Sequence, residues 1–163
     1  MNPWQGVLTI ILSLIMAMVL AVLHLPDAAP EWLGWLRPSW IVLVLFYWVI
    51  ELPQRIGILR AWVLGLCIDV LLGEPLGVNA VCLAALTYST GSFYERLRMY
   101  SLAQQSAVIF LIVLIIELFK NLLWIQFLNA DFHAAFLWGP LTSALMWPFV
   151  YQVLRLSSRP VSF

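Results

Sequence analysis

The chain has 163 residues, of which 64% are apolar or aromatic and only 10% are charged, and its mean hydropathy is +0.98. Soluble domains carry about 25% charged residues, so this composition excludes a soluble domain, a disordered region and a disulfide scaffold, and it predicts an integral membrane protein. Eight acidic and eight basic residues give no net charge, and one lysine without a basic run argues against nucleic-acid binding.

Six apolar stretches follow one another along the chain, and a helix that spans a membrane needs roughly 20 mostly apolar residues. We therefore predict an all-α integral membrane protein whose residues 1–163 form a single polytopic domain. The spans are expected at about 6–25, 38–52, 57–72, 76–94, 102–128 and 134–154. The second and third are short, so we expect them to be tilted or extended into flanking aromatic residues. No Lys or Arg precedes the first stretch, which is therefore expected to be a retained span.

Prolines, glycines and charges separate the spans. Pro38 suits the first turn of the second span, where its missing N–H costs nothing. Pro53 closes that span, and residues 73–77 (Gly-Glu-Pro-Leu-Gly) form a turn signal between the third and fourth. The charged cluster of Glu95, Arg96 and Arg98 separates the fourth span from the fifth.

The arginines predict the orientation, because short loops rich in Lys and Arg stay cytoplasmic. If both termini and the even-numbered connections share one side, that side holds six arginines and the other side holds only Arg37. The six are Arg55, Arg60, Arg96, Arg98, Arg155 and Arg159. Both termini are therefore expected in the cytoplasm.

Three charged residues fall inside the predicted spans, namely Asp69, Glu117 and Lys120. Each costs about 2.5–3.5 kcal/mol at a helix centre, so each is a candidate for function. Glu117 and Lys120 share a helix face, which Asn121 extends. One interpretation is an internal Glu117–Lys120 pair with Asp69 hydrogen-bonded nearby, which fixes how the helices pack. Another is a polar cavity between the third and fifth spans that binds a partner helix or a small ligand.

Catalysis is the third and weakest interpretation. The sequence has no Ser/His/Asp set, no H-E-x-x-H motif and no glycine loop for phosphates. The two cysteines form no C-x-x-C motif and the two histidines stand alone. We therefore expect no catalytic residue, no metal site and no cofactor.

Several short motifs occur in a characteristic order. Arg37-Pro38-Ser39-Trp40 opens a span that contains Tyr47-Trp48 and closes with Leu52-Pro53-Gln54-Arg55. The stretch from Gly65 through Asp69 to Gly73 follows, then Gly77, and Met146-Trp147-Pro148-Phe149 stands near the end. This order resembles the bacterial rod-shape-determining MreD family of the proteobacterial type. The most specific part of the likeness lies between residues 37 and 77.

The resemblance implies a fold similar to the six-helix substrate-binding subunits of energy-coupling-factor vitamin transporters. It also implies a non-enzymatic component of the bacterial inner membrane that works in cell elongation and lateral peptidoglycan synthesis. MreC is the expected direct partner, and MreB, RodA and a penicillin-binding transpeptidase belong to the same machinery. A subunit that binds or transports a small molecule is the alternative, because fold does not establish function.

The resemblance also suggests roles for the motif residues. Pro38 and Pro53 would mark the ends of the second span, Arg55 would anchor the cytoplasmic turn, and Asp69 would do more than pack. Gly65 and Gly73 would permit close packing or a tight turn. Structural roles are expected for the remaining motif residues, which are Arg37, Trp40, Tyr47, Trp48, Gly77, Trp147 and Pro148.

Overall fold

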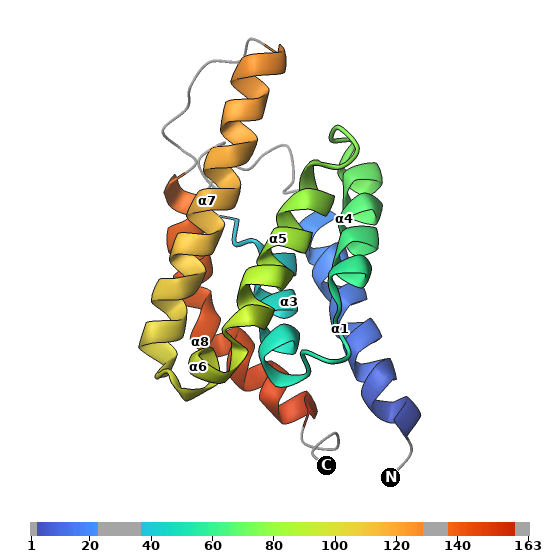
Figure 1. The fold of residues 1–163 in the computed structure, drawn as a ribbon, viewed down its shortest axis with the longest axis vertical. Coiled ribbons are helices and arrows are strands. Elements are labelled where there is room, and N and C mark those ends of the chain that lie inside the picture. The colour runs from blue at the N-terminus through green and yellow to red at the C-terminus, as the bar shows by residue number, and fades with distance from the viewer. Residues whose placement is uncertain (1–2, 23–36, 129–136, 159–163) are drawn as a thin grey trace, which may run out of the picture.

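The computed structural model describes residues 3–22, 37–128 and 137–158 of the chain. In these residues the protein is helical, with seven helices and no strand (Figure 1). The helices are α1 (Pro3–Val22), α3 (Trp40–Glu51), α4 (Ile58–Leu72), α5 (Val78–Ser92), α6 (Tyr94–Met99), α7 (Leu102–Leu128) and α8 (Trp138–Ser158).

Six of these helices lie at the six predicted apolar stretches, and the short α6 carries the charged residues Glu95, Arg96 and Arg98. The ends of the predicted spans at 23–25 and 134–136 lie outside the described residues. Several helix ends differ from the predicted spans by one to four residues. One of these differences concerns a motif residue, because Ser39 is the N-cap of α3 and Pro38 precedes it. Pro38 therefore stands before the first turn, where its carbonyl accepts a hydrogen bond from the Trp40 N–H.

Helix α7 is the one helix of the described residues that is long and apolar enough to cross a membrane, and an 18-residue stretch within Leu102–Gln126 has a mean hydropathy of 2.4. Its 27 residues extend about 40 Å at 1.5 Å per residue. The apolar segments in α1 and α3 are shorter. The 12 residues of α3 extend only about 18 Å, less than the roughly 30 Å of a hydrocarbon core.

Helix α3 lies at the centre of the bundle. All ten residues from Ile41 to Ile50 are buried, which fits a helix that is apolar on every side. Helices α1, α5, α6 and α8 pack against it (Figure 1). The second apolar stretch of the sequence is thus the core of the molecule.

Aromatic side chains of two helices, α3 and α8, fill this core. The rings of Phe46 and Trp147 meet edge to face with centroids 5.2 Å apart. Both buried indoles donate hydrogen bonds, which an indole N–H requires when water is excluded. Trp48 Nε1 donates to Ser13 Oγ of α1 at 2.8 Å, and Trp147 Nε1 donates to Gln105 Oε1 of α7 at 3.2 Å.

Helices α4 and α5 form the closest helix pair, and Gly65 makes their approach possible. A Cβ atom built on Gly65 would lie 2.3 Å from the Cα of Ala80, so only glycine fits between the two backbones. Gly73 ends α4 in the left-handed region at φ 66°, and Gly77 begins α5 at φ 101°. These glycines let the chain reverse within a few residues.

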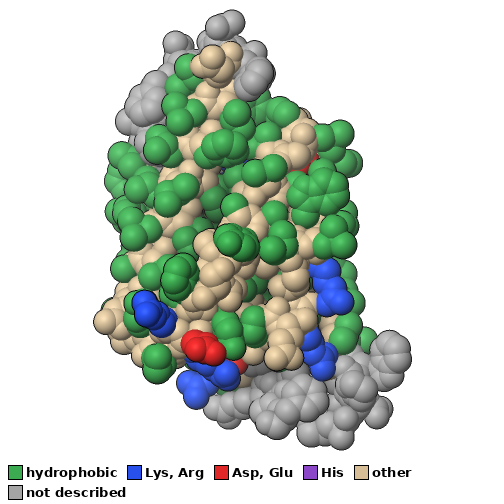
Figure 2. Space-filling view, viewed as in Figure 1, with side chains coloured by type: hydrophobic (Ala, Val, Ile, Leu, Met, Phe, Trp, Pro, Cys, Tyr) green, Lys and Arg blue, Asp and Glu red, His purple; other side chains and the backbone are tan. Residues whose placement is uncertain are grey.

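Arginines gather at one end of the bundle, as Figure 2 shows at the bottom of the view. Helix α1 begins and α8 ends at this end, which also holds α6 (Figure 1). Arg98 of α6 pairs with Glu51, at the end of α3, with 3.4 Å between Nη2 and Oε2. The turn between α4 and α5 lies at the opposite end.

Candidate functional site

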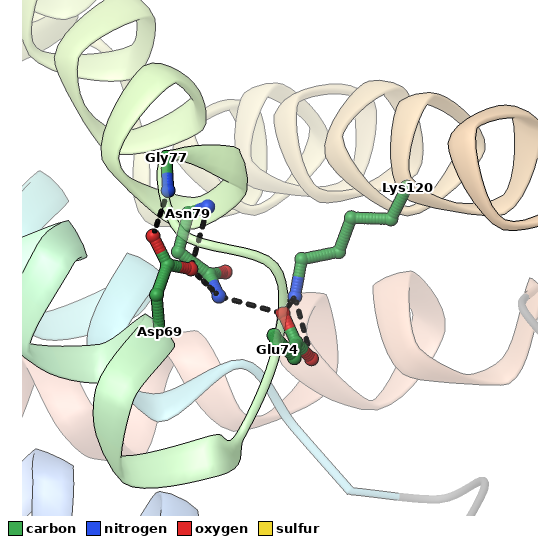
Figure 3. A network of polar contacts seen from close by, with 5 residues as sticks. All are labelled: Asp69, Glu74, Gly77, Asn79 and Lys120. Carbon is green, nitrogen blue, oxygen red and sulfur yellow. Dashed lines mark hydrogen bonds and ion pairs between the residues drawn. The ribbon is translucent and has the colours of Figure 1, made fainter. Parts of the chain in front are cut away.

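The carboxylate of Asp69 is fully buried in the last turn of α4 and caps the next helix. Its Oδ2 accepts the Gly77 N–H at 2.8 Å, and its Oδ1 accepts the Asn79 N–H at 3.0 Å and the Asn79 Nδ2 at 2.8 Å (Figure 3). Gly77, the N-cap residue of α5, has no side chain to cap the helix. Asp69 supplies that cap from α4, and its negative charge is stabilised at the positive end of the α5 dipole.

Glu74, in the turn after α4, connects this cap to α7. The Asn79 Nδ2 that bonds Asp69 also donates to Glu74 Oε2 at 2.7 Å. Lys120 of α7 reaches the same carboxylate, with 3.0 Å between Nζ and Oε2 (Figure 3). The side chains of Lys120 and Glu74 are only 15% and 22% exposed. Asp69, Glu74, Asn79 and Lys120 therefore form one polar cluster that ties α7 to the α4–α5 turn.

The internal Glu117–Lys120 pair that the sequence suggested is replaced by the Lys120–Glu74 pair. Residues three apart on a helix share a face, but the long lysine stem carries its ammonium group across to the neighbouring turn. Glu117 instead lines a cavity beside the cluster. In the part of the chain that the structure describes, Asn121 makes no side-chain hydrogen bond and stays outside the cluster.

The cavity has a volume of about 200 Å³ and lies between α1, the start of α3, α4, α5 and α7. Glu117, Lys120 and Asn79 line it, together with Arg37, Ser39 and Trp40 just before and at the start of α3. Asp69 does not line it, since its carboxylate is enclosed by the α5 cap. Of the three charged residues predicted from the sequence, Asp69 therefore lies in the closed cluster and Glu117 lines the neighbouring cavity. Lys120 belongs to both.

Several other motif residues have structural positions in the core or at helix ends. Tyr47, Trp48 and Trp147 are buried core residues. Pro148 lies inside α8, and Pro53 follows the Leu52 C-cap of α3. Arg55, in the turn after α3, accepts at its carbonyl from Arg60 Nη1.

Sequence reasoning missed two members of the cluster, Glu74 and Asn79. The sequence places Glu74 only in the turn between the third and fourth predicted spans, and Asn79 only within the fourth. A signal was present, because both are polar residues that flank the glycine turn immediately after Asp69. A buried aspartate near such a turn needs donors, and the first side chain with an N–H after Asp69 along the chain is that of Asn79.

Within the described residues no group of three or more His, Cys, Asp or Glu side chains could hold a metal ion. Cys82 is buried and Cys67 is exposed, and neither forms a disulfide.

The sequence matches the family described as "rod shape-determining protein MreD" over residues 3–157. The chain belongs to the MreD family. It is also similar to the rod shape-determining protein MreD of Haemophilus influenzae, with 39% identity over 126 residues that cover 77% of this chain and 78% of that protein. No solved structure matches the chain.

Membership of the MreD family implies a role in the determination of rod shape. The match includes the whole of the Asp69–Glu74–Asn79–Lys120 cluster and the central helix α3. The likeness to energy-coupling-factor subunits stays a prediction.

Proposed function

We propose that this MreD-family chain is a non-enzymatic, multi-pass protein of the bacterial inner membrane that binds MreC. Its six apolar helices would span the membrane with both termini in the cytoplasm, and the binding would support lateral peptidoglycan synthesis. MreB, RodA and a penicillin-binding transpeptidase would act in the same machinery. Family membership supports the role in rod shape, and the charge distribution between the two ends of the bundle supports the orientation.

A groove between α5 and α7 is the observation that favours binding through helices. It has a volume of about 290 Å³ and lies between small side chains of α5 and branched side chains of α7. Cys82, Ala85 and Ser89 are spaced three and four residues apart on α5, and Ile112 and Ile115 face them from α7. Small residues let helix backbones approach closely in lipid, where packing and hydrogen bonds drive association. The single membrane span of MreC is the occupant that we propose.

Co-purification tests this function. Ala85→Leu fills the groove with a larger side chain, and we expect it to reduce the yield of MreC recovered with the tagged chain from detergent-solubilised membranes by about tenfold. Ala107→Leu is the matched control, because Ala107 is exposed on α7 and does not line the groove. Equal abundance of both variants is checked first. Full recovery of MreC with well-folded Ala85→Leu would contradict binding in this groove.

A subunit that binds a small molecule is the second candidate. The cavity beside Lys120 favours it, since ligand sites are mostly apolar hollows with a few convergent polar groups. Rescue of rod shape in a deletion strain separates the two candidates. The variant to use binds MreC but has a filled cavity. If MreC binding is the function, this variant restores rod shape, and if small-molecule binding is the function, it does not.

A further inference from the structure

The cavity between α1, α3, α4, α5 and α7 has the character of a binding site. Its volume of about 200 Å³ is several times the roughly 30 Å³ that a water molecule occupies in the liquid. Apolar side chains such as Ile68, Leu72 and Leu83 make up much of its wall. Among the described residues, its charged lining groups are Arg37, Glu117 and Lys120, which come from two different parts of the chain.

Among the described residues, two of these three charged side chains make no hydrogen bond and no ion pair. Lys120 is neutralised by Glu74, whose Oε2 lies 3.0 Å from its Nζ. The amide nitrogen of Asn79 is already used by Asp69 and Glu74. For the Glu117 carboxylate and the Arg37 guanidinium, the described residues provide no hydrogen bond and no ion pair. Both residues are half-buried and line the same cavity.

An unpaired charge in a largely apolar cavity is costly, so a ligand that matches both charges would bind favourably. The Glu117 carboxylate would bind a cation that donates hydrogen bonds, such as a primary ammonium group. The Arg37 guanidinium would bind a phosphate or a carboxylate, each of which can accept two hydrogen bonds from it. We propose that this cavity binds a zwitterion that carries an ammonium and a phosphate group, of the kind found in the headgroup of phosphatidylethanolamine.

The charge balance of the cavity selects a zwitterion over an anion. With Glu74 against Lys120, the remaining charges among the described lining residues are one positive group on Arg37 and one negative group on Glu117, which sum to zero. An anionic headgroup would satisfy Arg37 but leave Glu117 unpaired. Phosphatidylglycerol, which has no ammonium group, is therefore expected to bind more weakly than phosphatidylethanolamine.

The purified full-length chain in detergent tests this site by native mass spectrometry, titrated with phosphatidylethanolamine or with phosphatidylglycerol of the same acyl chains. We expect the wild type to bind phosphatidylethanolamine about tenfold more tightly, the size of effect that one charge-assisted hydrogen bond produces. Glu117→Gln removes this preference. Glu95→Gln is the matched control, because Glu95 is exposed on α6, away from the cavity, and it keeps the preference.

Ala21→Phe supplies a second, independent variant, since Ala21 lines the cavity and a phenyl ring would fill it. Thermal unfolding shows that each variant is folded before binding is compared. The filled variant is expected to lose binding of phosphatidylethanolamine. Equal binding of the two lipids by the wild type, or an unchanged preference in Glu117→Gln, overturns the proposal.

Soluble phosphoethanolamine distinguishes the two sources of the zwitterion. Displacement of the lipid by the soluble compound shows that the headgroup chemistry suffices and that a free zwitterion is an equal ligand. Failure to displace it, with the lipid preference intact, shows that the acyl chains contribute and identifies the lipid as the ligand. MreC is absent from these measurements, so their outcome is independent of the proposed association with MreC.

Discussion

Asp69 and Asn79 are joined by two hydrogen bonds to one oxygen, because Oδ1 of the aspartate accepts both the backbone N–H and the side-chain Nδ2 of the asparagine. A residue in the last turn of one helix thereby caps the first turn of the next. The cap holds the α4–α5 pair at the separation that Gly65 permits, and Glu74 extends it to α7.

Substitution of Asp69 is expected to loosen this end of the bundle. Asp69→Ala removes the acceptor for three hydrogen bonds to a buried carboxylate and should destabilise the fold by about 3 kcal/mol or more. Thermal unfolding in detergent measures the loss, and Glu95→Gln on the exposed face of α6 serves as the control. The same variant should bind MreC more weakly. A well-folded, equally abundant Asp69→Ala protein that recovers MreC at wild-type yield would disprove this expectation.

Substitution of Gly65 tests the contact between α4 and α5. Gly65→Ala places a Cβ atom 2.3 Å from the Ala80 Cα, so the helices must separate, at a cost of about 1–3 kcal/mol. Gly91→Ala is the matched control, because it lies within α5 and the nearest atom to its new Cβ, Val49 Cγ1, is 4.0 Å away. We expect the melting temperature to fall for Gly65→Ala only. A similar effect of both substitutions would point to helix propensity as the cause.

Substitution of Lys120 tests how much the Lys120–Glu74 ion pair contributes to the stability of the fold. Lys120→Met leaves a mostly buried carboxylate without a cation, and we expect a loss of about 3 kcal/mol. The double variant Lys120→Met/Glu74→Gln should recover part of this loss, since no unpaired charge remains. The exposed Arg98–Glu51 pair provides the comparison, and its removal should cost less than about 1 kcal/mol. Strict additivity of the two cluster substitutions in a double-mutant cycle would show that the pair is not coupled.

The buried indole of Trp147 should be sensitive to the loss of its N–H group. Trp147→Phe leaves Gln105 Oε1 without its donor inside the bundle, and we expect a destabilisation of about 1–3 kcal/mol. The amide group of Gln105 also donates to the Leu97 carbonyl, so α6 should lose protection together with α7. Hydrogen exchange measures this protection. Trp138→Phe, at an indole that is 51% exposed, should leave both helices unchanged.

Composition and residue order alone predicted several features of this protein. The chain has too few charged residues to cover the surface of a soluble protein, so its composition alone predicts a membrane protein. The motif order between residues 37 and 77 predicted the MreD family, which the family match confirmed. Proline and glycine act through local backbone geometry, and for that reason the turn at residues 73–77 was predictable without knowledge of the fold.

Only the tertiary structure decided which groups meet. Every face of α7 is largely apolar, so its sequence does not show which side contacts another helix or where the ammonium of Lys120 ends. The close approach of Gly65 and Ala80 places Asp69 beside the α5 N-terminus, and the turn then presents Glu74 to Lys120. Glu117 is left facing a cavity with Arg37, a residue 80 positions away in the chain. Such long-range partners depend on how helices pack, and helix packing is a property of the whole bundle rather than of any one segment.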